Sequence, residues 1–212
     1  MKKTFLLAVM LAALAICVFA QDYTPESDLL FARTDGNQSV IINGYTGSSS
    51  TVNIPPVIRG LPVTHIGDRA FDGKRLTGVT IPDSVTFIGG SAFRNNQLTS
   101  VTIPTSVTSI GSEAFRNNQL TSINIPNSVT SIGSTAFNNN QLTSITIPNS
   151  VISIGVYAFG NNPLTSITIP SNVNLGTYDN SFPSNFDDFY NGKARKQAGT
   201  YVFIYGSWDE EW

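Results

Sequence analysis

Residues 98–119 read LTSVTIPTSVTSIGSEAFRNNQ, and residues 120–141 repeat this stretch as LTSINIPNSVTSIGSTAFNNNQ. The period between the two stretches is 22 residues. Related units begin at Leu76, Leu142 and Leu164, and an earlier partial unit runs from Val63 to Phe71. Self-similarity at a fixed period of roughly 20–50 residues indicates a repeat architecture, such as a solenoid in which each unit forms one coil.

The apolar residues fall at fixed positions within each unit, and these positions should point inward. In the first quoted unit they are Leu98, Val101, Ile103, Val107, Ile110, Ala114 and Phe115. A single coil cannot bury this set, so stability has to come from stacking each coil on its neighbours. The sequence therefore predicts about five to six coils joined by parallel β-ladders, with continuous columns of isoleucine and phenylalanine inside.

Three other positions of the unit suggest how each coil turns. Proline cannot donate to a β-ladder, so Pro104 and its counterparts are expected to end a strand. The glycine after each isoleucine, such as Gly111, is expected to mark a turn that needs a permissive backbone. The paired asparagines, such as Asn117 and Asn118, are expected to satisfy loop backbone groups through side-chain hydrogen bonds.

The unit L-x-x-(V/I)-x-I-P-x-(S/N)-V resembles a leucine-rich repeat. The longer pattern I-P-x-x-V-x-x-I-G-x-x-A-F resembles the bacterial BspA-like leucine-rich repeat family, over about residues 52–173. This resemblance implies a right-handed leucine-rich-repeat coil and a secreted or cell-surface protein that adheres to host matrix proteins or to other cells. Family members often carry cysteine three residues before the repeat leucine, where this chain has Asn95, Asn117, Asn139 and Asn161.

Both ends of such a stack need a cap, because an open apolar end would aggregate. Within residues 21–51 the sequence predicts an N-terminal β-hairpin over 29–43, since two apolar runs flank the turn signal Asp35-Gly36. Within residues 174–212 it predicts a C-terminal cap that combines a short helix with a last strand over 200–205. The apolar face of that helix would consist of Phe182, Phe186, Phe189 and Tyr190.

The N-terminus has the pattern of an export signal. Lys2 and Lys3 precede an apolar run that reaches Ala20, which predicts a signal peptide over 1–20 and an extracytoplasmic protein, either secreted, surface-attached or periplasmic. Two alternatives stay open at this point. The segment could be retained as an anchor, or a lipid anchor could be attached at Cys17, although Ile16 departs from the residue that a lipobox requires there.

Composition excludes several classes of function. Charged residues make up 12% of the chain and the net charge is −2, so there is no basic excess for nucleic acid or anionic membranes. One Cys and one His leave no disulfide framework and no zinc-site spacing. His65 occupies a position held by serine or phenylalanine in other units, which favours a structural surface role over a catalytic one. The adjacent carboxylates are interpreted as solvated polar residues; these are Asp187, Asp188, Glu210 and Glu211.

No phosphate-binding loop or calcium-binding loop pattern occurs in the sequence. The sequence therefore predicts a protein that is not an enzyme and that uses no cofactor and no metal.

The outward positions of the predicted strands form two neighbouring polar columns. The candidate ligand-binding residues are Ser100, Thr102, Ser122, Asn124, Ser144, Thr146, Ser166 and Thr168. From Asn117 to Tyr178 the sequence contains no charged residue and no histidine. These columns predict an uncharged face that binds an extracellular protein or glycan ligand, as in an adhesin. The alternative is that serine and threonine simply suit a solvated sheet.

Other functions remain open from the sequence alone. A self-assembling envelope or coat protein is the main alternative, because low charge and asparagine-rich turns permit association. The protein could also inhibit an enzyme, and nothing in the sequence distinguishes this hypothesis from adhesion. Ice binding by regularly spaced threonines is disfavoured, because Asn124 interrupts the threonine column.

Overall fold

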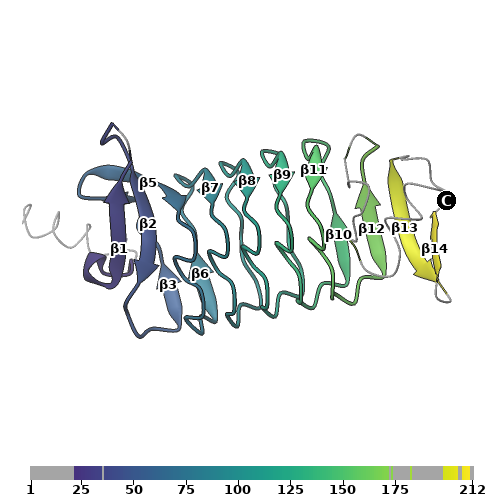
Figure 1. Cartoon of the computed structure of the whole chain (residues 1–212), viewed down its shortest axis with the longest axis horizontal. Coiled ribbons are helices and arrows are strands. Elements are labelled where there is room, and N and C mark those ends of the chain that lie inside the picture. Colours follow the sequence, from purple (N-terminus) through teal and green to yellow (C-terminus); the bar gives the residue numbers. More distant parts are fainter. Residues whose placement is uncertain are drawn as a thin grey trace, which may run out of the picture.

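The computed structural model describes residues 22–34, 36–171, 173, 182, 198–204 and 207–210. These residues form an elongated stack of coils that advances from the N-terminal strands to the C-terminal ones (Figure 1). The predicted signal peptide, Cys17 and all but Phe182 of the predicted C-terminal helix lie outside the described residues. The carboxylates Asp187, Asp188 and Glu211 lie outside them as well.

Within the described residues, three β-sheets run along the stack. The largest has eight strands, and in the central coils it receives one short strand from each coil. Its strands are β1 (Leu29–Arg33), β2 (Val40–Tyr45), β4 (Val57–Ile58), β5 (Leu61–Ile66), β7 (Phe87–Ile88), β8 (Ser109–Ile110), β9 (Ser131–Ile132) and β11 (Ser153–Ile154). The four-stranded sheet consists of β10 (Ser144–Thr146), β12 (Ser166–Ile169), β13 (Gly199–Ile204) and β14 (Ser207–Glu210), and the two-stranded sheet of β3 (Thr51–Asn53) and β6 (Gly78–Thr80). A 3-10 turn, η1 (Glu26–Asp28), precedes β1.

The register of the eight-stranded sheet follows the sequence repeat. Strands β7, β8, β9 and β11 pair in parallel. Ser109 lies opposite Phe87 on one side and opposite Ser131 on the other, and each partner is one 22-residue period away. The structure thus confirms a solenoid of leucine-rich-repeat type with the predicted period and parallel ladders.

A column of stacked phenylalanine rings runs through the core. The rings of Phe93 and Phe115 lie 11° from parallel, with centroids 5.3 Å apart. The column contains Phe71, Phe93, Phe115, Phe137, Phe159 and Phe182, and none of these side chains is more than 2% exposed. Full burial of one such side chain contributes roughly 1.5–3 kcal/mol. The predicted phenylalanine column is confirmed, and Phe182 extends it beyond the last full coil.

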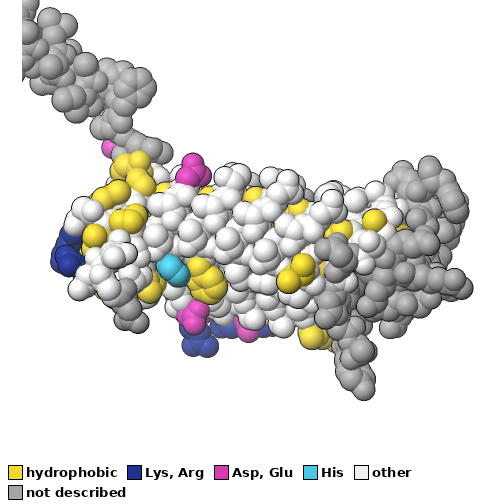
Figure 2. Space-filling model, turned by 90° about the horizontal axis from the view of Figure 1, so that it is seen from above, with side chains coloured by type: hydrophobic (Ala, Val, Ile, Leu, Met, Phe, Trp, Pro, Cys, Tyr) yellow, Lys and Arg dark blue, Asp and Glu magenta, His cyan; other side chains and the backbone are white. Residues whose placement is uncertain are grey.

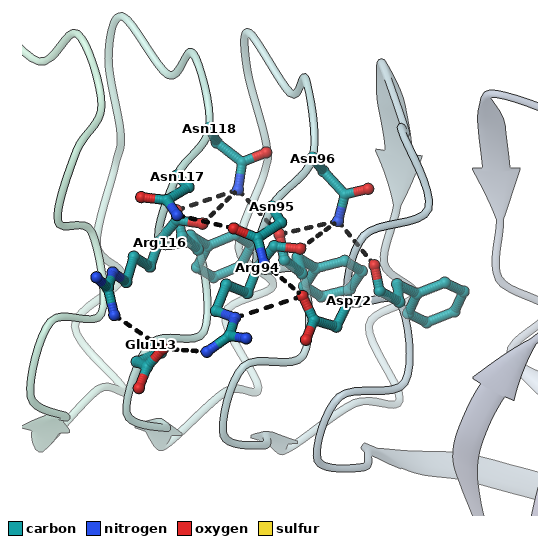
Figure 3. Close-up of polar contacts among 11 residues, drawn as sticks. Asp72, Arg94, Asn95, Asn96, Glu113, Arg116, Asn117 and Asn118 are labelled. Carbon is teal, nitrogen blue, oxygen red and sulfur yellow. Dashed lines mark hydrogen bonds and ion pairs between the residues drawn. The ribbon is translucent and has the colours of Figure 1, made fainter.

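The second asparagine of each pair is buried and ties neighbouring coils together (Figure 3). The Oδ1 atom of Asn118 accepts a hydrogen bond from the backbone N–H of Leu98, at 3.1 Å. Its Nδ2 atom donates to the carbonyls of Phe93 and Phe115, at 2.9 and 3.1 Å. The same contacts recur at Asn96, Asn140 and Asn162. Because the two carbonyls belong to residues one period apart, each buried amide bridges two coils.

The first asparagine of each pair has a left-handed backbone, with φ between 53° and 57°, and is exposed except at Asn117, which is half-buried. Asparagine adopts this conformation more readily than most residues. The Nδ2 atom of Asn117 donates to Asn95 Oδ1 at 2.7 Å, and that of Asn139 donates to Asn117 Oδ1 at 3.0 Å. Asn95 in turn donates to Asp72 at 3.1 Å. The asparagine pair therefore divides into a buried bridge and a surface ladder of amides.

The glycine after each isoleucine serves a different purpose from the one that the sequence suggests. Among the described glycines, positive φ values occur at Gly36, Gly60 and Gly73, and at none of the repeat glycines. A Cβ atom at Gly111 would instead lie 2.6 Å from the carbonyl carbon of Gly89, one coil away. The prediction of a turn that requires a permissive backbone is therefore wrong. Glycine is needed because neighbouring coils approach closely at this position.

The N-terminal hairpin and the C-terminal strand occupy the two ends of the stack. Strands β1 and β2 are antiparallel, with Phe31 opposite Ile42, which confirms the predicted hairpin. Strand β2 then pairs in parallel with β5 and so joins the hairpin to the eight-stranded sheet. At the other end, β13 pairs antiparallel with β12, where the sequence predicts the last strand.

Replacement of a buried asparagine should weaken the stack. In Asn118→Ala the buried N–H of Leu98 loses its acceptor, so we expect the free energy of unfolding to fall by about 1–3 kcal/mol. Asn117→Gly is the matched control, because glycine also suits the left-handed backbone and loss of the amide ladder there leaves no buried backbone N–H without an acceptor, so we expect a smaller loss of stability. Urea denaturation measures both values. Equal stability of the two variants would contradict the bridging role.

A methyl group at a repeat glycine should push two coils apart. In Gly133→Ala the new Cβ would meet the backbone of Gly111 and Ser112, and overpacking of this kind costs about 1–3 kcal/mol. The neighbouring substitution Ser134→Ala adds no atoms and serves as the control. Thermal denaturation compares the two variants, and an unchanged melting temperature for Gly133→Ala would refute the close-approach explanation.

Candidate functional site

The eight candidate residues form one surface, here called the Ser/Thr face, which consists of Ser100, Thr102, Ser122, Asn124, Ser144, Thr146, Ser166 and Thr168. The first six of these residues are exposed. Ser166 and Thr168 are half-buried in β12, beside β13, and the hydroxyl of Thr168 lies 2.8 Å from that of Thr200. The exposed part of the face therefore covers three successive coils.

The backbone beneath this face is less regular than the sequence suggests. Residues 100–102 and 122–124 carry no strand, whereas the equivalent residues in other coils form β6, β10 and β12. Among the described residues, no backbone N–H of 100–103 or 122–125 donates to a neighbouring coil. The ladder expected here is thus interrupted over two coils, and those coils are held together on their other sides.

The polar side chains of the exposed part have no partner within the described structure. None of Ser100, Thr102, Ser122, Asn124, Ser144 and Thr146 makes a side-chain hydrogen bond to another described residue. On the eight-stranded side, by contrast, the hydroxyl of Thr108 donates to the carbonyl of Thr86 at 3.3 Å, and that of Thr130 donates to Thr108 at 3.2 Å. The threonine hydroxyls on the eight-stranded side therefore bond to a neighbouring coil, whereas those of Thr102 and Thr146 on the Ser/Thr face have no hydrogen-bond partner among the described residues.

Most charged groups of the described residues lie in the N-terminal coils, and residues 117–171 contain none. Figure 2 shows basic and acidic side chains over the N-terminal half of the molecule and an uncharged surface beyond them. Arg94 Nη1 donates to Glu113 Oε2 at 2.6 Å, and Arg116 Nη1 lies 3.2 Å from the same oxygen. Arg94 Nε also lies 3.4 Å from Asp72 Oδ1, so the network links three coils (Figure 3).

Hydrogen bonding within this network shifts the pKa of two of its members. The hydrogen bond from Arg94 holds the pKa of the Glu113 carboxyl below its ordinary value of 4.5 and outweighs partial burial, which raises it. The same bond raises the pKa of the Arg94 guanidinium. Both groups are therefore charged at neutral pH and support the coil junction.

A cleft lies at the N-terminal end of the Ser/Thr face. It has a volume of about 520 Å³, and Ser100 and Thr102 line it together with Asp22, Tyr23 and Asp28 from the N-terminal segment. A second hollow of about 410 Å³ shares three of the lining residues, which are Tyr23, Asn53 and Thr80. The polar columns of the Ser/Thr face and the N-terminal segment therefore border the same cleft.

Hydrogen bonds to β3 hold the N-terminal segment beside this cleft. The N–H of Thr24 donates to the carbonyl of Asn53 at 2.8 Å, and the N–H of Asn53 donates to Thr24 Oγ1 at 2.9 Å. Asn53 Nδ2 also donates to the carbonyl of Asp22, at 3.0 Å. Sequence reasoning missed this cleft because these contacts join segments about thirty residues apart without any repeated pattern. The one available signal was Tyr23, an aromatic residue between polar neighbours.

The contacts of His65, the one histidine of the sequence, are those of a structural residue. His65 lies in β5, where its Nδ1 atom is 2.8 Å from Thr64 Oγ1 and its ring centroid is 5.8 Å from that of Phe87. In the part of the chain that is described, no three His, Cys, Asp or Glu side chains cluster in a way that could hold a metal ion. That part also contains no helix with the length and hydrophobicity needed to span a bilayer.

Comparison with known proteins identifies relatives of this architecture. A family model described as the BspA type leucine-rich repeat region matches residues 64–185 in six copies. A solved leucine-rich repeat protein of T. pallidum is 28% identical, with a TM-score of 0.61, over 71% of this chain and 72% of that one. A leucine-rich cell surface protein of Faecalibacterium prausnitzii is 24% identical, with a TM-score of 0.38, over 88% of this chain and 59% of that one.

A third solved structure, a leucine-rich repeat protein of Bacteroides capillosus, is 24% identical, with a TM-score of 0.42, over 69% of this chain and 97% of that one. No curated protein matches the sequence.

The pH dependence of stability tests the charged network. A carboxyl whose pKa is lowered on folding adds stability above its unfolded pKa and loses that contribution as the pH falls through its folded pKa. We therefore expect the melting temperature of the wild type to fall more steeply than that of Glu113→Gln as the pH drops below 4.5. Arg94→Gln should flatten the same part of the curve. Parallel curves for the wild type and Glu113→Gln would contradict this account.

Proposed function

This chain belongs to the BspA-type leucine-rich repeat family, and from that premise we propose that it is a non-enzymatic binding protein of the cell exterior. In this proposal it recognises a protein or glycan partner through the Ser/Thr face, as an adhesin does. Solenoid repeats present extended surfaces to partners, and the function of such a fold resides in its exposed columns.

The observation that carries this proposal is the set of unpaired polar groups on the face. Six exposed hydroxyl and amide side chains lack internal hydrogen-bond partners, and four of them, Ser100, Thr102, Ser122 and Asn124, lie over coils whose backbone ladder is interrupted. Groups that the fold itself does not use remain available to a ligand, which supports a binding role.

The charge distribution suggests how a partner would be recognised. The surface from residue 117 to 171 contains no charged side chain, so long-range steering contributes little and short-range hydrogen bonds have to supply specificity. Such a face suits polar, uncharged surfaces of proteins or glycans. The basic residues and apolar run at the N-terminus support export to the compartment where these partners occur.

The ends of the stack favour binding over self-assembly. The β1–β2 hairpin pairs with the first coil, and β13 pairs with β12 of the last described coil, so antiparallel strands stand between these coils and a second copy. End-to-end polymerisation, the main route to a coat or filament, is therefore disfavoured.

A binding screen with charge-bearing variants tests the proposal. The purified chain is screened against matrix proteins and glycans by biolayer interferometry, and we expect a saturable partner. A variant with lysine at Ser122, Asn124, Ser144 and Thr146 should lose at least tenfold in affinity, since four bulky charges would have to be desolvated at the contact.

The matched control carries lysine at four exposed positions outside the Ser/Thr face, namely Thr86, Thr108, Thr130 and Ile152. It adds the same charge and should bind as the wild type does. Undiminished binding by a folded face variant, or equal loss in both variants, would exclude the Ser/Thr face as the binding surface.

A further inference from the structure

The cleft at the N-terminal end of the Ser/Thr face is unlike the rest of that face. Its lining residues include two carboxylates, Asp22 and Asp28, and no lysine or arginine. Tyr23 is 40% exposed and lines both this cleft and the adjoining hollow. The site therefore combines an accessible aromatic ring, acidic hydrogen-bond acceptors and the serine and threonine hydroxyls of neighbouring coils.

Asn53 lines both hollows and holds the N-terminal segment beside them. Its N–H donates to Thr24 Oγ1 and its Nδ2 atom donates to the carbonyl of Asp22, while its own carbonyl accepts from the N–H of Thr24. The part of the cleft wall that carries Asp22 and Tyr23 is therefore fixed by hydrogen bonds within the chain.

The lining determines which class of ligand fits. Anionic ligands are disfavoured, because Asp22 and Asp28 would repel them and no cation is present in the lining to compensate. Purely apolar ligands would leave hydroxyl, amide and carboxylate groups without partners. A neutral sugar ring offers hydroxyl donors to carboxylate and amide oxygens, and its C–H face can pack on a tyrosine ring.

The dimensions of the site suggest more than one sugar ring. Volumes of about 520 and 410 Å³ both fall within the range of ligand pockets, roughly 300–1,000 Å³. The two hollows lie side by side and share Tyr23, Asn53 and Thr80. An oligomer with one unit in each hollow would place its linkage near the shared residues.

We infer that this cleft binds a neutral oligosaccharide of at least two rings, with Tyr23 as the stacking platform and Asp22 and Asp28 as acceptors for its hydroxyl groups. This inference rests on the proposed binding function and assigns a glycan ligand to one end of the face. The rest of the Ser/Thr face then serves either a longer glycan or a protein that carries it.

The probes are neutral oligosaccharides of hexose and N-acetylhexosamine units, arrayed beside their sialylated and sulfated counterparts and a lysine-rich peptide. The purified full chain is applied to the array, and each hit is measured by isothermal titration calorimetry. We expect saturable binding of a neutral oligosaccharide and at least tenfold weaker binding of its anionic counterpart. No neutral hit, or a preference for the anionic glycans or the peptide, would overturn the inference.

Substitutions then locate the site. Tyr23→Ala and Asp28→Asn should each weaken binding of the neutral oligosaccharide at least tenfold, while their melting temperatures stay near that of the wild type, because Tyr23 is exposed and Asp28→Asn keeps the size and shape of the side chain. Glu26→Gln is the matched control, since it removes the same charge two residues away without touching the cleft. Unchanged affinity in the Tyr23 and Asp28 variants would overturn the inference.

The two proposals can fail separately. If the cleft variants lose the oligosaccharide but keep a matrix-protein partner, the cleft assignment stands and that partner binds elsewhere on the face. If the lysine variant of the Ser/Thr face loses the partner while the cleft variants keep all ligands, the face proposal stands and the cleft assignment is wrong.

Discussion

Buried asparagine amides are the interaction on which the rest of this structure depends. Each coil turns sharply within 22 residues and leaves backbone carbonyls and an N–H in the core, where water cannot reach them. The amide of Asn118 satisfies the N–H of Leu98 and the carbonyls of Phe93 and Phe115 at once. Repetition of this contact fixes the spacing of the coils. The phenylalanine rings can then stack, and close approach at the repeat glycines becomes possible.

The contacts that hold neighbouring coils together lie mainly on the side of the eight-stranded sheet, and the Ser/Thr face contributes few of them. The eight-stranded sheet, the asparagine bridges and the phenylalanine column hold the coils together through residues 85–98 and their equivalents. The Ser/Thr face contributes isoleucines and valines to the core but, over two coils, no backbone ladder. Its outward side chains are therefore free to vary without loss of the fold. This separation of scaffold from surface is what allows a solenoid to acquire a binding function.

Much of this architecture could be predicted from the sequence, because the repeat itself encodes which residues stack. The period, the phenylalanine column and the hairpin over 29–43 all follow from patterns of apolar residues and turn signals. The role of Gly111 could not be predicted, because it depends on a distance between coils and not on the backbone angles of one residue. The cleft could not be predicted either, since it forms only where residues 22–24 happen to lie against β3. The repeated residues therefore predict the solenoid, whereas the cleft is formed by contacts of the N-terminal segment that are not repeated.

The central claim is that the eight-stranded side holds the coils together and the Ser/Thr face does not. Amide hydrogen exchange of the unliganded protein tests this claim most directly. Residues whose N–H groups bridge coils, such as Thr108, Gly111, Thr130 and Gly133, should exchange slowly, with protection near that of global unfolding. The amides of 100–103 and 122–125 should exchange at least about tenfold faster, because the described structure gives them no backbone acceptor. Equal protection in the two sets would mean that a continuous ladder underlies the Ser/Thr face, and the face would then be part of the scaffold and not a surface set apart for binding.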